Sequence, residues 1–268
     1  KPLQYYKNKY SNIRFRIYQY NDGDTASLSG NNIYSIIEDR NNNIWIGTYG
    51  TGLSLVLERE GEKMTCRRIN TQNSNISANE VRNLFEDSRG RIWVATTFGL
   101  NKINILNDSI YFDYYTYSPT TDSSISYNDI VHIFESSNGT LWFATFGGGI
   151  NQLLSGKGSK VLFRHYNHTN GLVNDAVFGI LEDKAGNLWL STEGGLSRFN
   201  PVTLRFDNYG QQNGLTSDRF SENTCARLKD GRLVFGSTGG LLIVNPENLA
   251  GNTFLPPIVF TNFQLFNQ

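Results

Sequence analysis

Residues 180–196 read ILEDKAGNLWLSTEGGL, in which an apolar run ends in two carboxylates, a short polar turn follows, and a second apolar run surrounds Trp189 before Gly-Gly-Leu. Short runs of β-branched, aliphatic and aromatic residues bounded by Gly, Asn, Asp and Ser are typical of β-strands joined by tight turns. The stretch therefore predicts a hairpin followed by the start of a third strand.

The same pattern recurs along the chain. Its central tryptophan falls at positions 45, 93, 142 and 189, and a degenerate fifth copy has Val234 in that place, which gives steps of 48, 49, 47 and 45 residues. A period of about 40 to 50 residues with several strands per unit is typical of one β-propeller blade. We therefore expect an all-β fold, a β-propeller of four-stranded blades with five repeats visible.

Each repeat divides into strands a to d, counted from the centre of a propeller. In the first repeat strand a is the Ile33 segment, strand b contains Trp45 and strand c runs from Leu53 to Leu57. The aromatic d strands are expected at 15–20, 66–69, 111–117, 161–166 and 204–209. The first d strand precedes every a strand and the fifth blade lacks one, so an N-terminal strand that completes the last blade would close a ring. The alternative is a fragment of a larger ring.

The composition limits the partners. The 268 residues include 24 Lys and Arg against 24 Asp and Glu, with a pI near 7.0, so no basic field is available for nucleic acid or an anionic membrane. No apolar run approaches the roughly 20 residues needed to span a bilayer. Cys66 and Cys225 form neither a disulfide framework nor a metal-ligand spacing. We expect no cofactor, no metal, no nucleic acid and no membrane contact in this chain.

Carboxylates recur where strand a turns into strand b. An Asp at a strand end accepts backbone N–H groups across the hairpin, and Gly supplies the positive φ of the turn. A catalytic pair needs two carboxylates that converge once, so one per blade favours turn chemistry over catalysis. The four tryptophans lie mid-strand among aliphatic residues and are expected to pack between blades. The residues predicted to be structural are Asp39, Asp87, Asp183, Gly90, Gly186, Trp45, Trp93, Trp142 and Trp189.

A ligand site is expected on one face. In a propeller the d–a connections and the b–c turns emerge together, and we call the side that they form the start face, because the a strands begin there. The residue four past each tryptophan varies most, and amide and carboxylate groups beside aromatic rings suit a polyhydroxylated ligand. The alternative is that Asn and Asp only terminate loops. The candidate binding residues are Tyr49, Phe146, Glu193, Asn32, Asn79, Asn128, Asp175 and Asp218.

The units around Glu38-Asp39 with Trp45 and around Glu182-Asp183 with Trp189 resemble the two-component regulator propeller repeat, over about residues 30–245. Residues 255–266 resemble the linker and first strand of the three-tyrosine, immunoglobulin-like domain that follows such propellers. The expected division is therefore an N-terminal tail at 1–12, blades at 13–250, and a linker with the first strand of a following domain at 251–268.

This resemblance implies a periplasmic sensor region of a hybrid two-component regulator, with seven-bladed rings, homodimerisation in the full-length receptor and recognition of oligosaccharides. The kinase would lie outside this chain, which is not expected to be an enzyme. Two alternatives stay open. One is a dimerisation scaffold that contacts no ligand, and the other is a propeller lyase, which needs a metal-dependent catalytic histidine on the channel face. Only His132 is placed for that role, and a satisfied strand histidine is the preferred interpretation.

Overall fold

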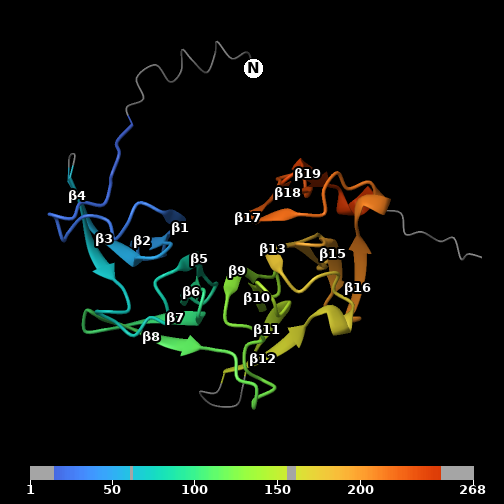
Figure 1. Ribbon diagram of the computed structural model, residues 1–268, viewed down its shortest axis with the longest axis horizontal. Coiled ribbons are helices and arrows are strands. Elements are labelled where there is room, and N and C mark those ends of the chain that lie inside the picture. Colours follow the sequence, from blue (N-terminus) through green and yellow to red (C-terminus); the bar gives the residue numbers. More distant parts are fainter. Residues whose placement is uncertain (1–14, 61–62, 156–160, 249–268) are drawn as a thin grey trace, which may run out of the picture.

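The computed structural model describes residues 15–60, 63–155 and 161–248. These residues form five antiparallel sheets set around a common centre, with β1, β5, β9, β13 and β17 innermost (Figure 1). The all-β propeller predicted from the repeat is confirmed. The expected tail at 1–12 and the expected linker and strand at 251–268 lie outside the described residues.

Four sheets have four strands each in chain order from the centre to the rim. Their strands are β1 (Ile33–Glu38), β2 (Ile44–Thr48), β3 (Gly52–Glu60) and β4 (Lys63–Ile69); β5 (Val81–Glu86), β6 (Ile92–Thr96), β7 (Gly99–Leu106) and β8 (Ser109–Tyr115); β9 (Ile130–Glu135), β10 (Leu141–Thr145), β11 (Ile150–Ser155) and β12 (Val161–Tyr166); and β13 (Val177–Glu182), β14 (Leu188–Thr192), β15 (Gly195–Asn200) and β16 (Arg205–Tyr209). We number these sheets blades 1 to 4.

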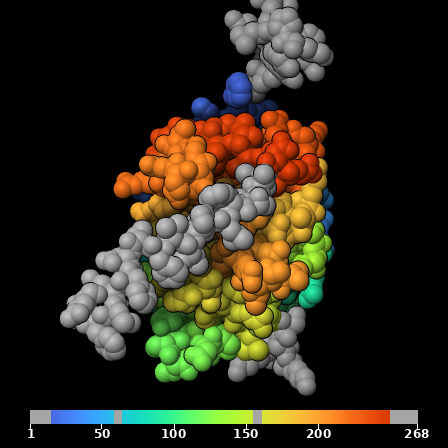
Figure 2. All heavy atoms as spheres, turned by 90° about the vertical axis from the view of Figure 1, so that its right-hand side faces the viewer, coloured from blue at the N-terminus to red at the C-terminus, as the bar shows by residue number. Residues whose placement is uncertain are grey.

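Blade 5 has three strands within the described residues, β17 (Phe220–Arg227), β18 (Leu233–Ser237) and β19 (Gly240–Val244). Single turns of 3-10 helix follow the outer strands at His168–Asn170, Gln211–Asn213 and Pro246–Asn248. Neighbouring blades contact one another in chain order. Figure 2 shows blade 5, in orange and red, lying against the yellow and orange residues of blade 4.

The expectation of a strand at 15–20 was wrong. This segment is irregular and lies beside blade 1, where Tyr18 packs on a cluster that contains Leu28 and Cys66. The backbone N–H of Tyr20 donates to Oδ1 of Asn31 (2.7 Å), and the guanidinium of Arg68 covers the Tyr20 ring at 4.8 Å. A d strand forms only when it pairs with a c strand, and the structure gives this segment no such partner among the described residues.

The four tryptophans fill the spaces between adjacent blades. Each side chain is at most 1% exposed. Trp45 of blade 1 shares a cluster with Val81 and Leu84 of blade 2, and Trp189 of blade 4 shares one with Phe235 of blade 5. Burial of such large side chains between sheets accounts for much of the apolar stabilisation of a propeller.

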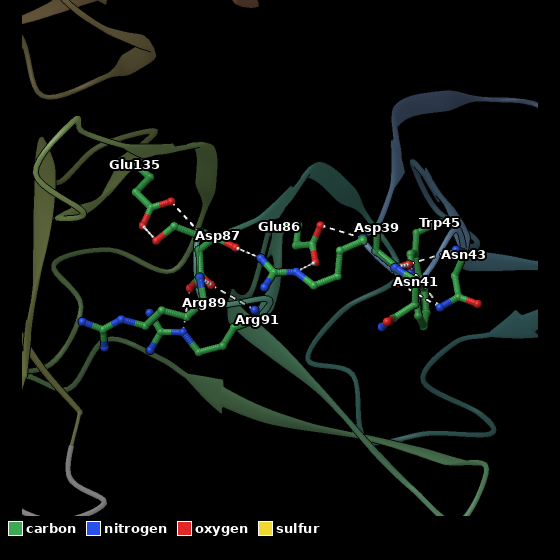
Figure 3. Close-up of polar contacts among 11 residues, drawn as sticks. Asp39, Asn41, Asn43, Trp45, Glu86, Asp87, Arg89, Arg91 and Glu135 are labelled. Carbon is green, nitrogen blue, oxygen red and sulfur yellow. Dashed lines mark hydrogen bonds and ion pairs between the residues drawn. The ribbon is translucent and has the colours of Figure 1, made fainter.

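The a–b turns are organised by their aspartates (Figure 3). Oδ1 of Asp87 accepts the backbone N–H groups of Arg89 (3.0 Å) and Arg91 (2.9 Å), while Oδ2 accepts Nε1 of Trp93 at 2.8 Å. Asp39 and Asp183 repeat this arrangement with their own tryptophans. The hydrogen bonds to Nε1 explain why a carboxylate and a buried indole recur six positions apart, since a buried N–H needs an acceptor.

The glutamates that end the a strands join one blade to the next. Glu86 accepts from the backbone N–H and Nε of Arg40, Glu135 accepts from the backbone N–H and hydroxyl of Ser88, and Glu182 accepts in the same way from Ser137. These contacts lie at the opposite end of the a strands from the start face, and two of them are drawn in Figure 3. These hydrogen bonds therefore link blades 1 to 4 at the side of the propeller opposite the start face.

Candidate functional site

The inner strands begin with a bulge. In blades 1 to 4 the pairing between the first and second strands slips by one residue, which leaves one residue of the a strand unpaired at the start face. A β-bulge redirects a side chain out of the ladder. The four residues concerned are Tyr34, Arg82, Val131 and Phe178.

Blade 5 has a larger version of this bulge. Phe220 pairs with Ser237 and Cys225 with Phe235, so the four residues 221–224 lie opposite the single residue Gly236. Asn223 adopts a φ of 53°, a conformation that non-glycine residues rarely take. We call residues 221–224 the blade 5 bulge. It brings residues of the last blade to the centre of the molecule.

Arg82 lies at this centre and forms ion pairs with carboxylates of two other blades. Its Nε and Nη2 donate to the two oxygens of Asp129 in blade 3 at 2.7 and 2.9 Å, and its Nη1 donates to Glu222 of the blade 5 bulge at 2.5 Å. Nδ2 of Asn223 donates to the Arg82 carbonyl (3.3 Å). Burial by itself lowers the pKa of Arg82, but the hydrogen bond and charge of Asp129 with the charge of Glu222 raise it above its ordinary value.

Two aromatic rings flank the Arg82 guanidinium. The ring centroids of Tyr49 and Phe146 lie 5.6 and 5.7 Å from it, within the range of cation–π contact. Tyr34 stacks on Tyr49 with centroids 5.0 Å apart, and Phe178 lies 5.9 Å from Phe146. Tyr34 is 45% exposed and Phe146 40%. The start face thus presents aromatic surfaces from blades 1 and 3 around a paired arginine, and the buried Phe178 of blade 4 packs behind Phe146.

The structure therefore brings two of the predicted binding residues, Tyr49 and Phe146, to one place. Their backbone N–H groups donate to the carbonyls of Asn32 and Asp129, which fixes each b–c turn to the beginning of its own a strand. Glu193 is exposed on blade 4, and its backbone N–H donates to the Ala176 carbonyl. It makes no described contact with Arg82 or the two rings.

Three other predicted binding residues use their side chains within loops. Oδ1 of Asn79 accepts from Thr71 N–H, Oδ1 of Asn128 accepts from Tyr117 N–H, and the Asp175 carboxylate accepts from the backbone N–H and Nδ1 of His168. These three side chains therefore stabilise loops, which is the alternative to ligand binding given in the sequence analysis. Oδ1 of Asp218 is buried and has no hydrogen-bond partner in the described part of the chain.

His132 follows the blade 3 bulge, and its Nε2 lies 3.9 Å from Sγ of Cys225. Gly179 of blade 4 lies against Cys225, since a Cβ there would lie 2.8 Å from that sulfur. Burial lowers the pKa of His132 to about 4 and raises that of Cys225 to about 11, so both are neutral at ordinary pH. Across the described residues no three His, Cys, Asp or Glu side chains form a metal-binding group.

Sequence reasoning missed Arg82 and Glu222. Arg82 carried a usable signal, because it occupies a position where the other complete repeats have Tyr34, Val131 and Phe178. Glu222 carried none, because it lies in the degenerate repeat and meets Arg82 across 140 residues of sequence. Among the described residues no helix is long and apolar enough to cross a bilayer.

A model of the family described as "two component regulator propeller" matches residues 27–50, 75–98, 124–147 and 171–194. Each match contains the end of a d–a connection, an a strand and the following b strand. The fifth, degenerate repeat, which carries the blade 5 bulge, lies outside these four segments.

The chain is 30% identical over 99 residues to "Histidine kinase P4" of Formosa agariphila, a match that covers 37% of this chain and 7% of that protein. It is 28% identical to the extracellular domain of a putative hybrid two-component system from B. thetaiotaomicron, with a TM-score of 0.71, over 88% of this chain and 30% of that one. The chain therefore spans less than a third of either relative.

A lyase that acts on virginiamycin B, from Staphylococcus aureus, has a similar structure, with a TM-score of 0.54 and 16% identity over 81% of this chain and 71% of that one. This likeness shows the propeller fold alone. The repeat and the similarity to the extracellular domain distinguish the present chain from that enzyme.

Proposed function

Because this chain is built from two-component regulator propeller repeats, we propose that it is a ligand-recognition part of the periplasmic sensor region of a hybrid two-component regulator and responds to oligosaccharides. One solved structure that is similar to this chain is the extracellular domain of a putative hybrid two-component system. The kinase that the signal would reach lies outside this chain, which acts by binding and not by catalysis.

The observation that supports a sugar ligand is the arrangement of Tyr34, Tyr49 and Phe146 around Arg82 on the start face. Aromatic faces bind the C–H faces of pyranose rings, and polar groups at their edges bind hydroxyls, which is the usual division of labour in small-molecule sites. Arg82 contacts both the Tyr49 and the Phe146 ring and is itself paired with Asp129, whose carbonyl accepts from the Phe146 N–H, so little order has to be gained on binding.

A thermal-shift screen of the 268-residue chain against plant, host and microbial oligosaccharides tests this proposal. A ligand that binds only the native state raises the Tm in a concentration-dependent way. Tyr49→Ala and Phe146→Ala should each abolish the shift, while Tyr114→Ala, which removes an exposed tyrosine from the outer strand β8, should leave it unchanged. An equal shift in all variants would place the ligand elsewhere, and no shift with any glycan would argue against sugar recognition here.

A scaffold role in dimerisation is a second candidate. Strands β7 and β8 of blade 2 expose Ile105, Leu106, Tyr111 and Tyr114 at 43 to 61%. Tyrosines with aliphatic neighbours are enriched at protein interfaces. Sedimentation that shows a monomer at high concentration would count against this role for the chain, and loss of a dimer in Tyr114→Ala would support it.

A further inference from the structure

We infer that the glycan bound at the start face carries no net negative charge, so that it is an uncharged or amino-bearing oligosaccharide and not a uronic or sulfated one. This inference rests on the proposed function and narrows the class of its ligand. It depends on three features of the described residues, namely the charge of the face, the state of Arg82 and the kind of hydrogen-bonding groups left free.

The start face is acidic. The d–a connections between successive blades, the b–c turns and the bulges carry seven carboxylates and two guanidinium groups within the described residues. The carboxylates are Glu80, Asp122, Asp129, Asp175, Glu193, Asp218 and Glu222, and the guanidinium groups are Arg82 and Arg219. The chain as a whole has no net charge, so this excess is local. Like charges a few ångströms apart repel with little screening, because the Debye length is about 8 Å at physiological salt.

Arg82, the cation at the centre, is not available to a ligand anion. All three of its side-chain nitrogens already donate to carboxylate oxygens of Asp129 and Glu222, and Tyr49 and Phe146 flank its guanidinium. Its side chain is 10% exposed. A ligand carboxylate or sulfate that took the place of Glu222 would leave that glutamate's charge without its partner in a partly buried place. Displacing one member of such a pair is costly.

The Glu193 carboxylate is exposed on this face and has no hydrogen-bond donor among the described residues. Arg219 is exposed as well, but carboxylates outnumber guanidinium groups on the face. A carboxylate needs donors, and a sugar offers them as hydroxyl or ammonium groups. A sulfate offers further acceptors and no donor. Together with the acidic charge, this selects a donor-rich ligand that is neutral or positive.

Titration calorimetry with three hexasaccharides of different charge tests the inference. The probes are cellohexaose, chitosan hexamer and hexamannuronate, each measured with the 268-residue chain in low salt and in about 0.5 M NaCl. We expect cellohexaose, chitosan hexamer or both to bind, with affinity that changes less than about twofold with salt for the neutral sugar and weakens for the cationic one. The uronic sugar should bind at least roughly tenfold more weakly than the better of the two.

A charge variant keeps the test independent of which sugar fits best. Glu222→Gln removes one carboxylate and preserves the shape of the bulge, so it should lower the affinity for chitosan hexamer and raise that for hexamannuronate. Glu38→Gln is the matched control, because Glu38 is an exposed glutamate at the far end of strand β1. It should alter neither affinity. Equal effects of the two variants would show that the charge of the start face does not select the ligand.

The inference is overturned if hexamannuronate binds as tightly as the other probes and loses affinity as salt is added, since this would show attraction of an anion. That result would leave oligosaccharide recognition itself intact. If none of the three probes binds, and a broad screen of glycans gives no Tm shift, both the inference and the proposed function fail.

Discussion

Asp87 illustrates how one residue can fix a turn and a core position together. Its carboxylate accepts two backbone N–H groups, Nε1 of the buried Trp93 and Nε of Arg91 at 2.6 Å. Burial raises the pKa of Asp87, but these donors outweigh it and hold the pKa below its ordinary value. In blade 3 the same place is taken by Ser136, whose hydroxyl accepts from Trp142 at a longer 3.4 Å.

Asp87→Ala should lower the free energy of unfolding by about 3 kcal/mol, because it leaves a buried indole N–H and two turn N–H groups without an acceptor. Chemical denaturation compared with the wild type measures the loss. Asp207→Ala is a suitable control, since that carboxylate is 56% exposed and pairs with Arg198 at the surface. Similar losses in both variants would contradict the assignment.

His132 predicts a pH dependence at the same scale. Its folded pKa of about 4 lies below the 6.5 of an unfolded histidine, so the unfolded state binds more protons between these values. Stability is therefore complete above pH 6.5 and falls as the pH is lowered toward 4, by up to about 3 kcal/mol. Denaturation of the wild type and His132→Phe between these pH values checks this. The variant should lose the slope, and an unchanged slope would assign it to other groups.

At the scale of the elements, the a strands of blades 2, 3 and 4 are each joined to the a–b turn of the blade before. Glu182 is 6% exposed, and its two oxygens accept from the backbone N–H and hydroxyl of Ser137 at 2.7 and 3.0 Å. The series ends at blade 5, where Arg227 stands in the place of the glutamate and Lys184 pairs with Glu247 instead.

A double-mutant cycle of Ser137→Ala and Glu182→Ala should give a coupling of about 1 to 2 kcal/mol, since a hydrogen bond to a buried carboxylate exceeds the average. The cycle of Lys184→Ala and Glu247→Ala is the comparison. Both of those side chains are more than half exposed, so their coupling should not be measurable. The measurement is urea unfolding of each set of four proteins. Equal coupling energies in the two cycles would contradict the expected difference between the buried and the exposed pair.

The elements themselves were largely predictable. Four b strands were predicted from the tryptophans at their centres, Trp45, Trp93, Trp142 and Trp189. The same local pattern recurs in each repeat, so each copy supports the assignment of the others. The prediction of a strand from Phe15 to Tyr20 was wrong because an alternating aromatic pattern shows only that a segment can form a strand. Whether it does depends on a partner strand, which the pattern does not reveal. The centre was not predictable from Tyr49 and Phe146 alone, because Arg82 and Glu222 come together only through tertiary structure and an irregular bulge.

At the scale of the whole molecule, the Arg82 cluster joins blades 2, 3 and 5. Arg82→Ala leaves Asp129 and Glu222 partly buried without their counter-charge and should cost about 3 to 5 kcal/mol. Hydrogen exchange should accelerate in β17 more than in β1, because the blade 5 bulge loses its anchor. Arg232→Ala, at a 47% exposed side chain, should change neither. Uniform acceleration through all blades would instead indicate general destabilisation.

The bulge of blade 5 also changes how the blades communicate. Without it, blade 2 would be connected to blade 5 only through the blades between them, and a disturbance would weaken as it passed along. The contact between Glu222 and Arg82 adds a shortcut between the second and fifth units, so the series becomes a closed circuit. Whatever moves Glu222 is therefore felt at two distant sheets at once, without relay through the two sheets between them.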